Sequence, residues 1–213
     1  MIRLDQDGPV WTVTLDRTDK ANALTEEMLS ELVRIAQAAQ EARAFILTGA
    51  GRVFSAGADL EAARAGLALS PLWEQLSAAI AALPGLSIAA LNGTVAGGSM
   101  GMVLACDLRL AVPTAQFFYP VMKMGFLPQP SDPGRMAALI GPARTKLLLM
   151  GGEKIDAYTA LDYGLIERIL DPSDLLSTAT QLASDAAAAK PDIARGIKRL
   201  CAGLDPKPAG PSS

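Results

Sequence analysis

The chain has 213 residues, of which 50% are hydrophobic and 19% are charged, and its net charge is −3. That length suits one domain, two at most, and the acidic balance argues against nucleic acid or an anionic membrane as the main partner. The sequence contains no histidine, which excludes a Ser-His-Asp or Cys-His nucleophilic site and an imidazole-ligated metal. Any acid–base chemistry must therefore use Asp, Glu, Lys, Tyr, Cys or a held water.

Predicted strands and helices alternate along the first half of the chain. In order, the hydrophobic pattern gives a half-buried strand at residues 10–15, a helix at 25–36, a strand at 44–48, a loop at 66–71, a helix at 72–83 and a strand at 87–91. Thr25 is the expected N-cap of the first helix, because its side chain can accept a hydrogen bond from the first turn. The alternation is typical of an α/β domain.

The second half of the chain ends in predicted helices. Its pattern gives a strand at residues 108–112, a loop with four prolines at 120–134, helices at 143–150, 157–163 and 173–189, and a helix that starts at Pro191. We expect a core over residues 1–190, a short C-terminal helix over residues 191–204 and a disordered tail over residues 205–213.

Cys106 and Cys201 are the two cysteines of the sequence, and neither belongs to a CxxC pair. Both are expected to be buried and reduced, as in a cytoplasmic protein. The first residues lack the long apolar region of a signal peptide, and no apolar stretch reaches the roughly 20 residues that span a bilayer. A cytoplasmic location without a membrane partner is therefore expected.

Two loops are rich in glycine and other small residues, so their backbone can approach a ligand closely. They span residues 54–60 (FSAGADL), after a strand, and residues 93–101 (GTVAGGSMG), before a helix. Unpaired N–H groups at a helix start favour a negatively charged oxygen, and two such donors that converge form an oxyanion hole. The alternative for both loops is close packing of backbone against a neighbouring strand.

Two short motifs nearby carry little weight. Residues 97–101 match the G-x-S-x-G nucleophile elbow of hydrolases, but Ser99 would need a base and the chain has no histidine. Residues 49–51 (GAG) are a fragment of a dinucleotide-binding fingerprint without its third glycine or acidic partner, so NAD binding is only weakly indicated.

Five segments, two of which belong to the loops described above, occur together in a characteristic order. They are residues 17–24 (RTDKANAL), 54–60 (FSAGADL), 92–98 (NGTVAGG), 105–109 (ACDLR) and 157–166 (AYTALDYGLI). Together they resemble the crotonase superfamily of enoyl-CoA hydratases and isomerases, over residues 3–200 of this chain. The resemblance implies a spiral of ββα turns with a shortened C-terminal helical region, an acyl-CoA substrate, and a homotrimer or hexamer.

The same resemblance implies a site made mostly of backbone. By position within the motifs, the N–H groups of Ala58 and Gly98 would form the oxyanion hole for the thioester oxygen. The CoA moiety would lie beside Lys20, Ala21, Ala56 and Asp59. Asp59 itself is expected to be a structural or helix-capping residue rather than a catalytic one. No metal and no separate cofactor are expected, because CoA is part of the substrate.

The sequence departs from the hydratases of this family at both catalytic glutamates. The first belongs three residues after the oxyanion glycine, where this chain has Gly101, and the second follows a proline, where this chain has Val121. Hydration needs one group to activate water and another to protonate the α-carbon, each contributing about 10²–10⁴-fold. Efficient hydration is therefore not expected, and a lyase or an isomerase reaction stays open.

An alternative acid or base is sought in the proline-rich loop. Asp132 is the best candidate for a general base, because a carboxylate beside an apolar pocket can have a raised pKa. Its alternative role is a turn or N-cap residue before Pro133. The other polar candidates of this region are Tyr119, Lys123, Gln129 and Ser131. Tyr119 is expected to be a packing residue with a bonded hydroxyl, and Lys123 a solvated surface residue.

Three functions compete on these observations. The first is an enzyme that processes acyl-CoA thioesters through a stabilised enolate. The second is a non-catalytic acyl-CoA-binding protein that has lost hydratase activity, and a weaker third is a structural subunit without a ligand. The missing glutamates favour the second function, whereas the presence of both glycine-bearing loops favours either of the first two.

Overall fold

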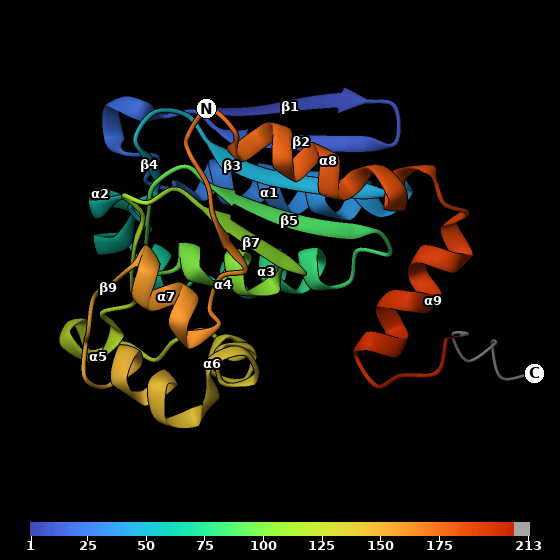
Figure 1. Ribbon diagram of the computed structural model, residues 1–213. Coiled ribbons are helices and arrows are strands. Elements are labelled where there is room, and N and C mark those ends of the chain that lie inside the picture. The colour runs from blue at the N-terminus through green and yellow to red at the C-terminus, as the bar shows by residue number, and fades with distance from the viewer. Residues whose placement is uncertain (207–213) are drawn as a thin grey trace, which may run out of the picture.

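Figure 1 shows the computed structural model of the protein, which describes residues 1–206. Its strands are β1 (Ile2–Asp7), β2 (Val10–Leu15), β3 (Ala44–Gly49), β4 (Val53–Ser55), β5 (Leu86–Leu91), β6 (Thr94–Ala96), β7 (Leu108–Ala111), β8 (Gln116–Phe118), β9 (Ile155–Asp156) and β10 (Arg168–Ile169). Its α-helices are α1 (Glu26–Ala38), α2 (Leu60–Arg64), α3 (Leu72–Ala81), α4 (Ser99–Ala105), α5 (Val121–Met124), α6 (Asp132–Leu149), α7 (Ala157–Tyr163), α8 (Leu175–Ala188) and α9 (Pro191–Cys201).

The strand order confirms the α/β class and the spiral. Strands β1, β2, β3, β5, β7 and β10 form one sheet in that order, and β4, β6, β8 and β9 form a second. Each turn of the chain places one strand in each sheet before a helix: β3, β4 and α3 are followed by β5, β6 and α4, then by β7, β8 and α6. Because β2, β3, β5 and β7 pair in parallel, each turn advances the spiral by one strand.

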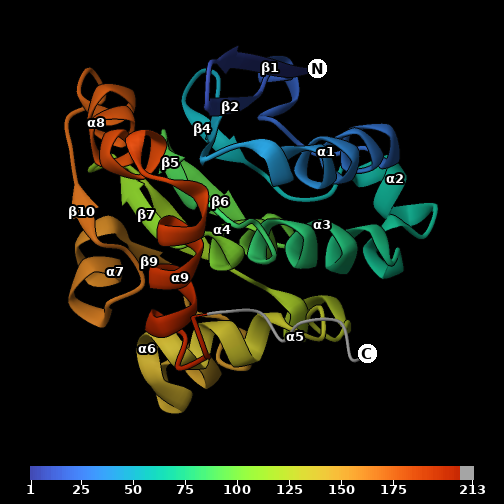
Figure 2. The same cartoon turned by 90° about the vertical axis from the view of Figure 1, so that its right-hand side faces the viewer.

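Helices cover both faces of the larger sheet. Helix α8 packs on β3, β5 and β7, whereas α1 packs on α3 and α3 on α4. Figures 1 and 2 show α8 on the opposite side of this sheet from α1 and α3. Strands β3 and β5 are consequently buried on both faces, and their residues are almost wholly apolar, as in parallel strands that helices cover on both sides.

The same spiral positions the two glycine-bearing loops. One loop follows β4 and the other follows β6, and these two strands pair directly in the smaller sheet. The loops therefore lie side by side although about 40 residues separate them in the sequence.

Most predicted elements are confirmed, but the strands of the smaller sheet (β4, β6, β8 and β9), β10 and helix α2 are not among them. Thr25 caps α1 by accepting a hydrogen bond from the Met28 N–H at 3.3 Å, and Gly164 ends α7 in left-handed backbone. The prediction misses β1, an edge strand whose residues are mainly polar and exposed. The loop predicted at residues 66–71 contains a 3₁₀ turn at Leu67–Leu69.

The loop predicted at residues 120–134 is wrong in two places. Helix α5 lies inside it, and α6 begins at Asp132, so the carboxylate is neither in a loop nor at the N-cap, which is Ser131. Pro133 fits the first turn of a helix because no N–H donor is needed there. Helix α6 then continues through the predicted helix at residues 143–150, with a bend at Gly141 and Pro142.

The two cysteines differ in exposure. Both thiols are free, but Cys106 is buried whereas Cys201 is exposed on α9, so the expectation of two buried thiols is wrong for Cys201. The tail predicted over residues 205–213 falls, from residue 207 onward, outside the described residues. No helix within residues 1–206 has the length and apolar character needed to cross a membrane.

Candidate active site

The loops after β4 and β6 contact each other through their glycines. Gly57 has a φ of +89° and Gly97 a φ of +57°, values that other residues rarely adopt. A Cβ at Gly57 would lie 2.7 Å from the carbonyl oxygen of Ala96 and 3.5 Å from the Cα of Gly97. Glycine at position 57 therefore permits an approach of two backbones that a side chain would prevent.

The first loop leaves the N–H of Ala58 without a hydrogen-bond partner among the residues that the structure describes. The neighbouring backbone groups are paired with Leu24. The Leu24 N–H donates to the carbonyl of Gly57 at 2.8 Å, and the Asp59 N–H donates to the carbonyl of Leu24 at 2.9 Å. One free donor is thus held on a loop whose flanking residues are fixed.

The second loop leaves the N–H of Gly98 free at the start of α4, again within residues 1–206. The adjacent Gly97 N–H donates to the carbonyl of Phe118 at 3.0 Å and ties this loop to β8. The ring of Trp73 packs on Gly98, where a Cβ would lie 3.0 Å from two ring carbons. Trp73 is not among the residues predicted at the site, because its place on the buried face of its helix indicates only core packing.

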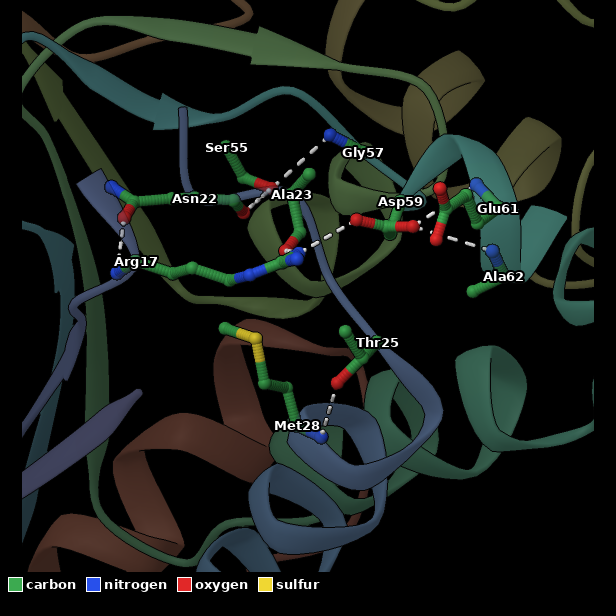
Figure 3. A network of polar contacts seen from close by, with 10 residues as sticks. All are labelled: Arg17, Asn22, Ala23, Thr25, Met28, Ser55, Gly57, Asp59, Glu61 and Ala62. Atoms are coloured by element: carbon green, nitrogen blue, oxygen red, sulfur yellow. Dashed lines mark hydrogen bonds and ion pairs between the residues drawn. The ribbon is translucent and has the colours of Figure 1, made fainter. Parts of the chain in front are cut away.

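Asn22 is linked to the first loop through Ser55, as Figure 3 shows. It is fully buried, and its side-chain amide donates to one carbonyl oxygen in β4 at 2.8 Å and to one directly after β3 at 2.9 Å. Its side-chain oxygen accepts from the Arg17 N–H at 2.8 Å. Its carbonyl accepts from the hydroxyl of Ser55 at 2.9 Å, and that hydroxyl accepts from the Gly57 N–H at 3.2 Å. The backbone that carries Ala58 is therefore rigidly held.

Asp59 caps α2, which confirms its predicted structural role. Its Oδ1 accepts from the N–H groups of Glu61 at 3.0 Å and Ala62 at 3.3 Å. Its Oδ2 accepts from Nη1 of Arg17 at 2.8 Å (Figure 3). The hydrogen bond from Arg17, followed by that from Ala62, lowers the pKa of this carboxyl group, so Asp59 stays ionised.

The structure brings together the other residues expected near CoA. The Ala56 N–H donates to the carbonyl of Ala21 at 3.0 Å, which joins the segment before the first loop to the turn at residues 18–21. Lys20 and Ala56 are exposed and Ala21 is half-buried. All three are therefore open to a ligand from the surface next to the first loop.

Asp132 is fully buried, and its carboxyl group lies against Gly101. A Cβ at Gly101 would be 2.9 Å from Oδ1 and 3.1 Å from Oδ2, so the carboxyl group occupies the space of a side chain at position 101. Oδ2 accepts from the hydroxyl of Tyr119 at 2.9 Å, whereas Oδ1 has no partner within residues 1–206. Burial raises the pKa of Asp132 to about 6, against the hydrogen bond from Tyr119, which lowers it.

Two charged residues also face this carboxyl group. Besides burial and Tyr119, Arg135 lowers the pKa of Asp132 and Glu74 raises it. Glu74 on α3 accepts from the backbone N–H of Ser131 at 3.2 Å and from its hydroxyl, while Arg135 donates to the hydroxyl of Ser77. Glu74 is not among the predicted site residues, because nothing in the pattern of its helix connects it with residues almost 60 positions later.

Val121 lies in apolar surroundings. It lines a cavity of about 400 Å³ between α5 and α6, together with Phe126, Pro133 and Leu149. The position expected from the resemblance to match the second hydratase glutamate therefore faces an apolar cavity.

Lys123, Tyr119 and Ser99 are placed as expected, and Gln129 carried no expected placement. Lys123 is exposed, Gln129 is half-buried, and Tyr119 is buried with its hydroxyl bonded. Ser99 is fully buried, and its hydroxyl donates to the carbonyl of Ala96 at 2.7 Å. That bond, without a base beside it, argues against Ser99 as a nucleophile.

Comparison with known sequences agrees with the motifs. The family profile described as enoyl-CoA hydratase/isomerase matches residues 5–203. The chain is 36% identical over 196 residues to YngF of Bacillus subtilis, whose name places it among enoyl-CoA hydratases/isomerases, and covers 75% of that protein and 87% of its own length. It is 32% identical over 190 residues to a short-chain-enoyl-CoA hydratase of Clostridium acetobutylicum, covering 73% of that protein and 85% of its own length.

Solved structures extend the similarity over nearly the whole chain. The enoyl-CoA hydratase of Bacillus anthracis superposes with a TM-score of 0.85 and 32% identity, covering 94% of this chain and 82% of that one. DspI of Pseudomonas aeruginosa also gives a TM-score of 0.85, with 31% identity, covering 95% of this chain and 86% of that one.

Proposed function

The chain belongs to the enoyl-CoA hydratase/isomerase family, whose common activity is acyl-CoA processing, and from this premise we propose the step that it catalyses. The N–H groups of Ala58 and Gly98 bind the thioester oxygen, and Asp132 moves a proton between carbons of the acyl chain. The reaction is an isomerisation of an enoyl-CoA rather than a hydration.

The two free N–H groups support the oxyanion hole. Removing a proton from the carbon beside a thioester places negative charge on the thioester oxygen, and two preorganised donors stabilise that charge. Ala58 and Gly98 suit this task because both N–H groups lack a partner within residues 1–206 and their loops touch through Gly57. Lys20, Ala21 and Ala56 are the proposed contacts of the CoA moiety, next to the first loop.

Asp132 supports the proton transfer. As a carboxylate it removes a proton from the α- or γ-carbon, and as a carboxylic acid it returns the proton to the other carbon. The C=C bond moves, and no atom is gained or lost. A pKa of about 6 lies near neutral pH, where one group can act in turn as base and acid. Its free Oδ1 is the proposed proton-carrying atom.

Val121 is the observation that favours isomerisation over hydration. Addition of water needs a second group to hold the water, and this position instead lines an apolar cavity. A proton shift needs one carboxylate, which is what Asp132 supplies.

A second candidate is acyl-CoA binding without turnover. It is favoured by the complete burial of Asp132, because a carboxyl group without exposed surface must be uncovered before a substrate carbon reaches it. The donors at Ala58 and Gly98 would then bind the thioester oxygen without chemistry.

The substitution Ala58→Pro tests the proposed function, with Ala58→Gly as the matched control. Proline removes the N–H donor and breaks no hydrogen bond of residues 1–206, whereas glycine keeps the donor. We expect conversion of 3-enoyl-CoA to 2-enoyl-CoA to fall about 10²–10³-fold in Ala58→Pro and to stay near wild type in Ala58→Gly.

Three results would contradict this proposal, and each would overturn a different part of it. Full turnover by a folded Ala58→Pro variant would remove Ala58 from the oxyanion hole. Addition of water by the wild-type protein would replace isomerisation by hydration. Saturable binding of the thioesters with no product would favour the second candidate.

A further inference from the structure

We propose that Tyr119 is a positioning residue that holds the carboxyl group of Asp132 in the space beside Gly101 and leaves Oδ1 free for the substrate. The inference rests on the acid–base role proposed for Asp132. It gives a second function to a buried tyrosine that otherwise reads as a packing residue.

Tyr119 is the one residue that donates a hydrogen bond to the Asp132 carboxyl group within residues 1–206. Its hydroxyl lies 2.9 Å from Oδ2, and Oδ1 is unpaired. The two charged neighbours are bonded elsewhere, Glu74 to Ser131 and Arg135 to Ser77. The orientation of the carboxyl group therefore depends on Tyr119.

The backbone links Tyr119 to the oxyanion loop. β6 and β8 pair in parallel with Ala96 opposite Phe118, and the Gly97 N–H donates to the carbonyl of Phe118 at 3.0 Å. Gly98 and Tyr119 each follow directly on one of these bonded residues. The pairing of β6 with β8 therefore holds the Gly98 N–H and the Tyr119 hydroxyl in a fixed relative position. This fixes the carboxyl group of Asp132 relative to the proposed oxyanion.

Gly101 provides the room for this arrangement. It lies three residues after Gly98 on α4, about 4.5 Å further along the helix axis. Any side chain there would meet the carboxyl group of Asp132, since even a Cβ would lie 2.9 Å from Oδ1. The carboxyl group that a glutamate at position 101 would provide is thus supplied from α6 and held there by Tyr119.

Tyr119→Phe tests this role, because it keeps the ring and removes the hydroxyl. The hydrogen bond from Tyr119 lowers the pKa of Asp132, as does Arg135, whereas Glu74 raises it. We expect the acidic limb of kcat/KM for 3-enoyl-CoA to move upward by about one pH unit, with kcat at pH 6 reduced about fivefold and KM nearly unchanged. Tyr158→Phe, at an exposed tyrosine of α7, is the matched control and should leave the profile unchanged.

A titration that needs no turnover separates this inference from the proposed function. Carbon-13 NMR of protein with labelled aspartate, with Asp132→Asn to assign the signal, gives the midpoint of Asp132 directly. We expect a higher midpoint in Tyr119→Phe than in wild type. An unchanged midpoint, or a loss of kcat without a shifted profile, would overturn the positioning role. If wild type converts no enoyl-CoA, the proposed function fails and the midpoint still decides the role of Tyr119.

Discussion

The carboxyl group of Asp132 is buried with one oxygen unpaired, the single such side-chain atom among residues 1–206. A buried charge without full pairing costs free energy, and burial accordingly raises the pKa of this group to about 6. This unfavourable group lies against Gly101 of α4, the helix that begins directly after the free N–H of Gly98. Strongly shifted carboxyl groups of this kind concentrate at functional sites.

This cost predicts how stability depends on pH. Because the pKa of Asp132 is about 6 in the folded state and its ordinary value is 3.8, the folded state binds more protons between these pH values. The contribution of Asp132 to the free energy of unfolding should therefore fall as pH rises from about 4 to about 6, and level off above. The full difference of about two pKa units corresponds to ~3 kcal/mol.

Urea unfolding of wild type and Asp132→Asn across pH 4–8 measures this contribution as a difference. The variant should gain stability over wild type as pH rises through that window, while Asp162→Asn, at an exposed aspartate, should track wild type. The lowered pKa values of Asp59 and Asp156 act below their ordinary value of 3.8 and cancel in the difference. A difference that does not vary with pH would show that Asp132 is not the buried, shifted group described above.

At the scale of elements, α4 and α6 meet where Gly101 faces Asp132. Gly101→Glu should destabilise the protein by roughly 1–3 kcal/mol, because the new side chain overlaps the carboxyl group and adds a second buried negative charge. Adding Asp132→Gly should restore most of the loss, since it vacates the same space. Urea unfolding of both single variants and the double variant measures the coupling. Additive effects in the double variant would show that the two positions do not share one space.

The sequence predicts an element well where one signal dominates. Residues 44–48 and 87–91 are continuous apolar runs, and the structure buries both faces of those strands. The prediction of a loop over residues 120–134 is wrong in part because its prolines indicate irregular backbone, although Pro133 is compatible with a first helical turn. β1 is not predicted because its apolar signal is weak. An edge strand needs apolar residues on one face only, and here these are Ile2 and Leu4.

The candidate site also has parts that the sequence predicts and parts that depend on tertiary packing. The glycine-bearing turns are visible in the sequence itself, whereas Ala58 and Gly98 were singled out as donors by the resemblance to the family motifs. Asp132 was predicted as a base for its chemistry, but its place beside Gly101 depends on how α4 packs on α6. Glu74 and Trp73 reach the site from α3 through tertiary packing alone, which leaves no pattern in the sequence.

On the scale of the whole molecule, the spiral unites residues from distant turns in one site, while α9 lies at the periphery (Figures 1 and 2). Apolar side chains of α9 are exposed, among them Ile193, Ile197 and Leu200. The expected homotrimer or hexamer remains a prediction. Contact between subunits through α9 would cover these exposed side chains, which can be measured.

The reactivity of the two cysteines measures whether α9 is exposed. Cys201 on α9 should react with a thiol reagent in the native protein, whereas Cys106 should react only after unfolding, because it is buried and burial raises its pKa to about 12. One thiol per chain should therefore react rapidly before denaturant is added and the second afterwards. Slow reaction of both thiols in the native protein would show that α9 is covered, and a Cys201→Ser variant identifies which thiol responds.

The proton shift proposed for Asp132 is tested most directly by turnover in heavy water. Saturated and enoyl-CoA thioesters are incubated in heavy water with wild type and with Asp132→Asn, and their masses are measured. Wild type should move the double bond without gain of water or loss of CoA, with deuterium on carbon in the fraction of turnovers in which the Asp132 proton exchanges with solvent before it is returned. Both the double-bond shift and the incorporation should be at least about 10²-fold slower with Asp132→Asn at unchanged thioester binding. Equal incorporation by both proteins, or water added to the enoyl group, would contradict a proton shift carried by Asp132.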